Sequence, residues 1–82
     1  MMVAMIDGVA LRLSPLEYRL LDLLAHNPAR VMTATEIAEQ LHGAADGSAA
    51  NAIEALVVRL RRKIGPNIVE TRRGFGYTLV DS

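Results

Sequence analysis

One segment, from about residue 49 to residue 64, limits most strongly what this chain can fold into. Its apolar residues recur at i, i+4, i+7 and i+11, which is the spacing of one narrow stripe along a helix. They are Ile53, Val57, Leu60 and Ile64. Such a stripe must be covered by other elements, and Gly65-Pro66 marks the point where the helix would end. The chain is therefore predicted to fold around one long amphipathic helix.

Two shorter helices are predicted ahead of it, each starting with a capping-box pattern. Residues 14–17 are SPLE, so Ser14 can cap the helix, Pro15 suits its first turn and Glu17 completes the box. Residues 33–36 are TATE and start the second helix, which continues to Gly43. The first helix has leucines at helical spacing until Asn27-Pro28. They are Leu16, Leu20, Leu23 and Leu24.

Short strands are predicted at both ends of the chain. Residues 9–13 (VALRL) alternate apolar and polar, and residues 2–6 would pair with them through a two-residue turn at Asp7-Gly8. Residues 68–71 and 77–80 form a second hairpin around TRRGFGY, and residues 44–49 form a loop. The predicted fold class is α+β. It is a winged helix-turn-helix, in which a three-helix bundle is followed by a C-terminal hairpin called the wing.

Composition excludes several other kinds of protein. A chain of 82 residues with 51% hydrophobic and 22% charged residues is typical of one folded domain. It contains no cysteine, which excludes disulfides, thiolate catalysis and cysteine metal sites. The opening MMVAM is too short for a signal peptide, and no run approaches the roughly 20 apolar residues of a membrane span. A cytoplasmic protein is expected.

The formal net charge is zero, but the charge is unevenly distributed along the chain. Residues 1–58 contain three basic and seven acidic residues, whereas residues 59–82 contain six basic and two acidic residues. The C-terminal part is therefore predicted to attract phosphate while the rest stays acidic.

The basic residues lie where a DNA-binding surface would need them. With the apolar stripe turned inward, another set of residues falls on the outward half of the long helix, and Arg61 and Lys63 flank it. The set is Asn51, Ala55, Val58, Arg59 and Arg62. The major groove of B-DNA is about 12 Å wide and accepts one such helix. The wing, with Arg72 and Arg73 near its tip, would lie at the neighbouring minor groove.

Four stretches of the chain carry a resemblance to a known family. They are LSPLEYRLLDLLAHNPARVM, TEIAEQL, NAIEALVVRLRRKIG and IVETRRGFGYTL. They resemble the DNA-binding effector domain of bacterial response regulators of the OmpR/PhoB family, over residues 13–80. The resemblance implies a transcription regulator of a two-component system. Such proteins normally carry a receiver domain before the effector, so residues 1–82 are expected to be a single, excised effector domain.

The resemblance also implies site residues and partners. The base-reading and phosphate-binding positions of the family fall on Asn51, Ala52, Ala55, Arg59 and Arg61. Its minor-groove arginine falls on Arg73, with Thr71 near the DNA backbone, and Arg72 is expected to contact phosphate or solvent. The outward Val58 and Arg62 complete the predicted DNA-binding set. The implied partners are double-stranded DNA with direct-repeat sites, a second copy of the protein on that DNA, and RNA polymerase.

The chain departs from the family pattern at three positions, and these support an alternative function. Ala34 replaces a frequent phosphate-facing arginine, and Leu56 and Val58 replace histidine or other polar or basic residues. A winged-helix module that binds protein, with weak or no DNA binding, would use an exposed Leu56 and Val58. Six basic residues between 59 and 73, opposed only by Glu70, favour the DNA-binding interpretation.

Enzymatic and metal-binding functions are not expected. Gly74 and Gly76 lack the third glycine of a nucleotide-binding loop and lie between two predicted strands. His26 and His42 are too far apart for a local metal pair. No catalytic residue, cofactor, metal site, small-molecule substrate or membrane contact is therefore predicted. Glu54 is interpreted, like Glu17, as a capping-box partner.

Overall fold

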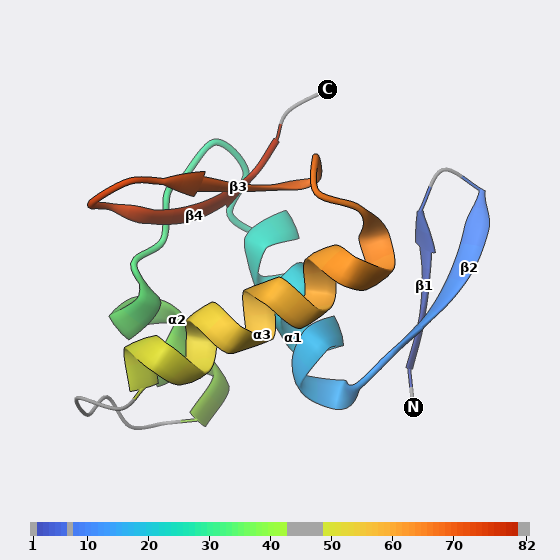
Figure 1. The fold of residues 1–82 in the computed structure, drawn as a ribbon, viewed down its shortest axis with the longest axis horizontal. Coiled ribbons are helices and arrows are strands. Elements are labelled where there is room, and N and C mark those ends of the chain that lie inside the picture. Colours follow the sequence, from blue (N-terminus) through green and yellow to red (C-terminus); the bar gives the residue numbers. More distant parts are fainter. Residues whose placement is uncertain (1, 7, 43–48, 81–82) are drawn as a thin grey trace.

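The computed structural model describes residues 2–6, 8–42 and 49–80, and it has the predicted architecture. The element order is two strands, three helices and two strands, in two separate antiparallel hairpins. Figure 1 shows helix α3 (Ala49–Ile64) crossing the middle of the molecule, with the C-terminal hairpin alongside it and the N-terminal hairpin beyond its far end. The winged helix-turn-helix prediction is confirmed.

The three helices enclose a single core. Helix α1 (Pro15–Ala25) and helix α2 (Ala34–His42) pack against each other and against α3. The α3 stripe is buried as predicted, and α1 contributes Leu20 and Leu24 while α2 contributes Ile37 and Leu41. The buried α3 residues are Ile53, Leu56, Val57, Leu60 and Ile64. Each such side chain contributes roughly 1.5–3 kcal/mol by leaving water, so this face holds α3 in place.

The N-terminus of α1 is fixed by its capping box and by an ion pair with α3. The Glu17 backbone N–H donates to the Ser14 hydroxyl, and the Ser14 backbone N–H donates to the Glu17 carboxylate. Lys63 Nζ lies 2.6 Å from the same carboxylate. Burial alone would raise the pKa of Glu17, but the hydrogen bonds from Lys63 and Ser14 and the Lys63 charge outweigh it and leave this pKa below its usual value.

The second capping box is also confirmed, at the start of α2. The Glu36 N–H donates to the Thr33 hydroxyl, and the Thr33 N–H donates to the Glu36 carboxylate. The same carboxylate pairs with Arg30 in the turn before α2. Gly43 and residues 44–48 of the predicted loop lie outside the described residues, and Ala49, the last residue of that loop prediction, is the first residue of α3.

The N-terminal hairpin joins β1 (Met2–Ile6) and β2 (Val9–Leu13) in the predicted register. Ile6 pairs with Val9, which fits a two-residue turn, and Gly8 has a positive φ of 79°. Asp7, the other predicted turn residue, lies outside the described residues. Leu13 is fully buried at the end of β2 and attaches the hairpin to the helical core.

The C-terminal hairpin, or wing, joins β3 (Val69–Arg72) and β4 (Gly76–Leu79). The first strand begins and ends one residue later than predicted, and the second begins and ends one residue earlier. Strand β4 also pairs with the segment before α2, since Met32 and Tyr77 exchange two backbone hydrogen bonds of 2.8 Å. A Cβ on Gly76 would lie 2.0 Å from the Met32 carbonyl oxygen. Glycine is therefore required where β4 crosses this segment.

Two predictions about single residues are wrong. Leu56 is 2% exposed and belongs to the core, because the buried face of α3 is wider than the four-residue stripe. Glu54 cannot complete a capping box, because α3 begins five residues earlier at Ala49 and a capping-box partner lies in the first turn. Val58, by contrast, is exposed as predicted.

The contact at Gly76 gives a test of how the wing is attached. Gly76→Ala is expected to lower the free energy of unfolding by about 2 kcal/mol or more, because the methyl group overlaps the Met32 carbonyl and φ is 153°. Gly74→Ala is the matched control, since its φ is also positive but nothing lies within 4 Å of the added methyl. That variant should lose only about 1 kcal/mol. Urea denaturation measures the free energy of unfolding of both variants. Equal losses in the two variants would contradict a steric role for Gly76.

Candidate nucleic-acid interface

The outward face of α3 is exposed over its whole described length. The regular angular spacing of side chains around a helix, together with the buried stripe, determines which side chains point away from the core. The exposed side chains include six predicted DNA-binding residues, which α3 brings onto one surface: Asn51, Ala52, Ala55, Val58, Arg59 and Arg62. Glu54 and Lys63 of α3 are exposed as well. Val58 is 43% exposed, so an apolar side chain lies within an otherwise polar and basic face.

The tip of the wing projects three further predicted residues into solvent. Thr71, Arg72 and Arg73 are exposed, and the backbone turns at Gly74, whose φ is 78°. Arg73 lies in the three-residue connection between β3 and β4, where the Phe75 N–H donates to the Arg72 carbonyl. Arg72 lies 3.5 Å from the carboxylate of Glu70 on the same strand. An exposed pair of this kind is weak, so Arg72 is only partly neutralised.

Arg61 differs from the other basic residues of α3. It is half-buried, and its guanidinium is directed toward β3. It donates to the Val69 carbonyl oxygen at 3.1 Å from Nε and at 2.8 Å from Nη2, and Nη2 also lies 2.6 Å from the Thr71 hydroxyl. The structure thus brings Arg61 and Thr71 together, which sequence spacing did not indicate.

The wing tip also carries a residue that the sequence analysis did not select. Phe75 is 73% exposed, between Gly74 and Gly76. It lines a recess of about 330 Å³ together with Val31, Thr33 and Arg72. The sequence could have indicated this exposure, because Phe75 is flanked by two glycines in a predicted hairpin connection, where few side chains can cover it.

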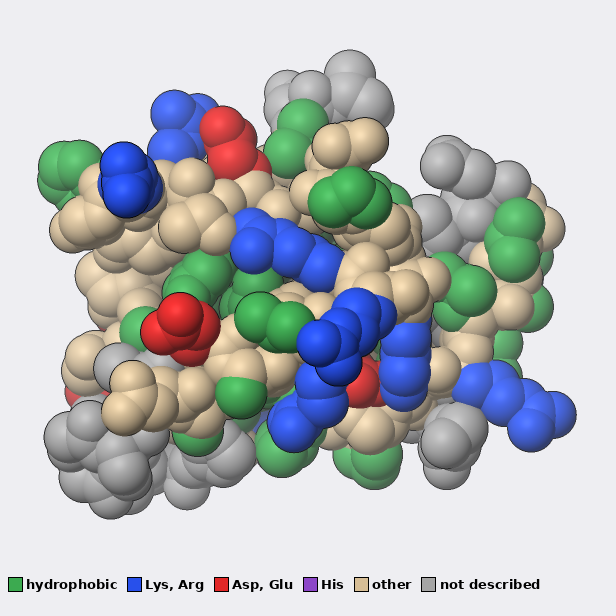
Figure 2. Space-filling view, in the orientation of Figure 1, with side chains coloured by type: hydrophobic (Ala, Val, Ile, Leu, Met, Phe, Trp, Pro, Cys, Tyr) green, Lys and Arg blue, Asp and Glu red, His purple; other side chains and the backbone are tan. Residues whose placement is uncertain are grey.

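The basic side chains of α3 and the wing share one face of the molecule. Figure 2 shows Lys and Arg side chains gathered over the second half of α3, with others on the wing above it. The acidic side chains on this face are fewer, and Glu17 and Glu70 are paired with Lys63 and Arg72. In an 82-residue chain without net charge, this placement gives one positively polarised surface.

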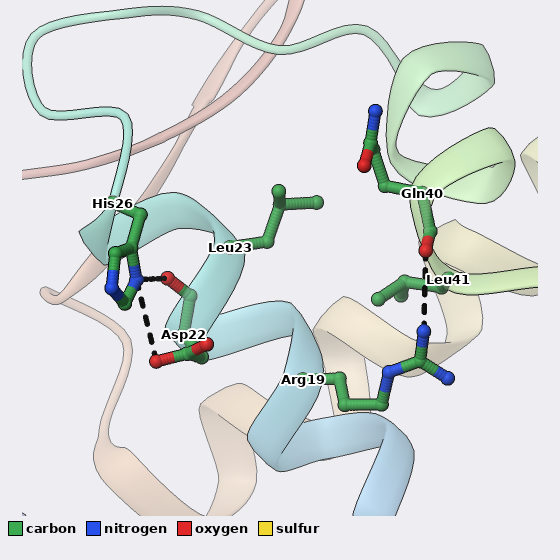
Figure 3. A pocket seen from close by; sticks show the side chains of 6 residues that line it. All are labelled: Arg19, Asp22, Leu23, His26, Gln40 and Leu41. Carbon is green, nitrogen blue, oxygen red and sulfur yellow. Dashed lines mark hydrogen bonds and ion pairs between the residues drawn. The ribbon is translucent and has the colours of Figure 1, made fainter.

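The described residues offer little that resembles an enzyme active site. A groove of about 250 Å³ between α1 and α2 contains the Asp22–His26 pair, with a 3.4 Å separation, and is closed by Arg19 donating to the Gln40 carbonyl (Figure 3). The lining has no hydroxyl, thiol or amine side chain, and its Asp22 and His26 side chains are both more than half exposed to water. His26 lies at the end of α1, and the His42 side chain lies outside the described residues.

No metal-ligand cluster or membrane-spanning helix occurs within the ranges that the structure describes. Three or more His, Cys, Asp or Glu side chains do not converge anywhere in residues 2–6, 8–42 and 49–80. The helices there are too short or too polar to cross a bilayer.

Comparison with known proteins agrees with this geometry. Residues 8–79 match the family described as "Transcriptional regulatory protein, C terminal". The response regulator protein PmrA of Pseudomonas aeruginosa is 40% identical over 72 residues, which are 88% of this chain and 33% of PmrA. The chain thus spans about a third of the length of the curated relatives it matches.

Solved structures share the fold. The DNA-binding domain of CpxR from Escherichia coli superposes with a TM-score of 0.80 at 30% identity, over 94% of this chain and 80% of that one. The DNA-binding domain of RstA from Klebsiella pneumoniae gives a TM-score of 0.84 at 23% identity, over 94% and 81% of the two chains. This chain therefore belongs to the transcriptional regulatory C-terminal family, the winged-helix output domains of OmpR/PhoB-type response regulators, and not to a family of enzymes.

Proposed function

We propose that this domain binds double-stranded DNA with α3 in the major groove and the wing at the adjoining minor groove. The observation that carries the proposal is the exposed basic face of α3 continuing onto the arginines of the wing (Figure 2). CpxR, at 30% identity, is described as a DNA-binding domain, and the RstA domain of the same fold was solved in complex with the RstA box. Binding of this kind would regulate transcription in the bacterial cytoplasm.

The proposed contacts divide into base reading and backbone binding. On α3, Arg59 reads a base edge, while the exposed residues around it contact bases or phosphates. These residues are Asn51, Ala52, Ala55, Val58 and Arg62. In the wing, Arg73 lies at the minor groove, and Thr71 and Arg72 lie at the sugar-phosphate backbone. Val58 suits apolar contact with a thymine methyl group.

The protein-binding alternative loses its main support. It needed both Leu56 and Val58 on the surface, and Leu56 is buried. Ala34 packs against the core. Val58 by itself, within a basic face, does not form an apolar patch of the size that marks a protein interface.

The arrangement of the whole regulator is part of the same proposal. We propose that two copies bind head to tail on direct repeats, that RNA polymerase is contacted when the bound protein activates, and that a receiver domain of the two-component type controls this output. The longest dimension of the domain is 36 Å, close to the roughly 34–36 Å of one turn of DNA. Neighbouring copies can therefore occupy successive turns of one DNA face.

Base reading by Arg59 is tested by a single truncation. Arg59→Ala is expected to weaken binding to the preferred site by about 1–3 kcal/mol and to relax preference at one base pair, because a bidentate guanine contact is lost. Arg19→Ala is the matched control, since Arg19 is an exposed arginine in the groove between α1 and α2. Binding-site selection from random duplexes measures the preference. Full retention of that preference by Arg59→Ala would contradict the assignment.

The minor-groove role of Arg73 predicts a change in flank preference. Arg73→Ala should weaken binding most on duplexes with A·T-rich flanks, because a narrow minor groove concentrates negative potential. It should also reduce the slope of log K against log salt by about 0.9, the contribution of one charge. Arg72→Ala, its neighbour in the wing, should keep the flank preference. Parallel salt titrations and the same flank preference for wild type and Arg73→Ala would show that Arg73 does not touch DNA.

Head-to-tail binding predicts a dependence on repeat spacing. The isolated domain should sediment as a monomer and pair only on DNA, on repeats whose centres are about 10–10.5 bp apart. Repeats about 15 bp apart should bind each copy independently, because the second site then lies on the opposite face of the duplex. Mobility-shift titrations compare the two spacings. A stable dimer without DNA, or equal cooperativity at both spacings, would contradict the arrangement.

A further inference from the structure

Arg61 occupies a position from which it holds two elements together. It lies on α3 between the exposed Arg59 and the exposed Arg62, but it is half-buried itself. Its guanidinium makes three hydrogen bonds of 2.6–3.1 Å, all to acceptors on β3. Within the described parts of the chain, neither Arg59 nor Arg62 has a hydrogen bond to the wing. One guanidinium thus bridges the proposed recognition helix and the wing.

The acceptors of Arg61 lie on the free edge of the wing. The Val80 N–H donates to the Ile68 carbonyl across the hairpin, so in the antiparallel alternation the carbonyls of Val69 and Thr71 point outward from β3. The opposite edge, on β4, is paired with Met32. Arg61 therefore provides hydrogen bonds to the outer edge of β3, as the Met32 backbone does to the outer edge of β4. A two-stranded hairpin is only marginally stable alone, so both attachments matter for its position.

The side chains around Arg61 support this placement. Tyr77 on β4 is half-buried and packs against the core. Burial raises the pKa of the Tyr77 hydroxyl, the negative charge of Glu54 on α3 raises it further, and the positive charge of Arg61 opposes the rise. The charges of Glu54 and Arg61 on α3 thus act in opposite directions on the Tyr77 hydroxyl of β4. Such a site disfavours release of the guanidinium, since the Val69 carbonyl would lose its donor.

We propose that Arg61 is a positioning residue that fixes the wing relative to α3, and so sets the distance between the base-reading Arg59 and the minor-groove Arg73. The inference rests on the DNA-binding function proposed above. It assigns Arg61 a role different from a phosphate contact. Loss of the Arg61 contacts should release the wing, so that Arg73 no longer reaches the minor groove in register with α3.

A double-mutant cycle on DNA tests the coupling. Arg73→Ala is expected to weaken binding to an A·T-flanked duplex at least about five-fold less in an Arg61→Ala background than in wild type, because the wing is already displaced. Arg62→Ala is the matched control, as the next basic residue of α3. The effect of Arg73→Ala should be unchanged in that background. Additive effects of Arg61→Ala and Arg73→Ala, with the salt slope of the double variant reduced by about 0.9 beyond that of either single variant, would overturn the proposal and show a phosphate contact.

Two further variants separate geometry from charge. Arg61→Lys keeps the charge but loses the planar fork, so it should restore neither the preference for A·T flanks nor the part of the salt slope that Arg73 contributes. Thr71→Val removes the hydroxyl that accepts from Arg61, so it should also weaken the preference for A·T flanks. Rescue of that preference by Arg61→Lys would overturn the positioning role. If Arg61→Ala does not fold, as thermal unfolding will show, Arg61→Lys replaces it in the cycle.

A measurement without DNA distinguishes failure of this inference from failure of the proposed function. In the free domain, Arg61→Ala should speed amide hydrogen exchange in β3 and β4 and leave the α1 and α2 amides unchanged, whereas Arg62→Ala should change neither. Unchanged exchange in the wing would overturn the attachment itself. If Arg61→Ala speeds exchange in the wing but the wild-type domain binds no DNA, the attachment by Arg61 is supported and only the proposed function is refuted.

Discussion

Burial of one face of α3 is the interaction on which the rest of the structure depends. Five of its side chains are at most 8% exposed, and the helix packs against α1, α2 and β2. A domain of this size buries only about 60% of the surface that its unfolded chain exposes, so few other contacts could replace them. Because a helix has fixed angular spacing, burying this face also fixes which residues face outward. Packing and the presentation of the basic side chains are therefore set by the same constraint.

The position of the wing depends indirectly on the burial of α3. Its strands have four residues each and form no core of their own. Strand β4 is held by the backbone pairing with Met32, which only a glycine at position 76 permits. Strand β3 is held by Arg61, whose own position follows from the burial of α3. The arginines of the tip are thus positioned by two attachments on opposite edges of one hairpin.

Charge distribution matters more for this domain than net charge. The formal net charge is zero, and Lys63 is occupied by the buried Glu17, which links the end of α3 to the start of α1. The exposed Arg59, Arg62 and Arg73 then face solvent from α3 and the wing. In a small domain such a surface produces a local potential that a polyanion senses at short range, within a Debye length of roughly 8–10 Å.

The sequence by itself determined the element order, both capping boxes, the outward face of α3 and the arginine at the wing tip. These depend on local spacing and turn chemistry, which residues within a few positions of one another decide. Only the tertiary structure decided that Leu56 is buried, since the width of a buried helix face depends on the elements that cover it. The same holds for Arg61, whose acceptors lie eight and ten residues away on another element. Whether an arginine meets solvent or a neighbouring strand is decided by where that strand packs, and spacing along one helix contains no such information.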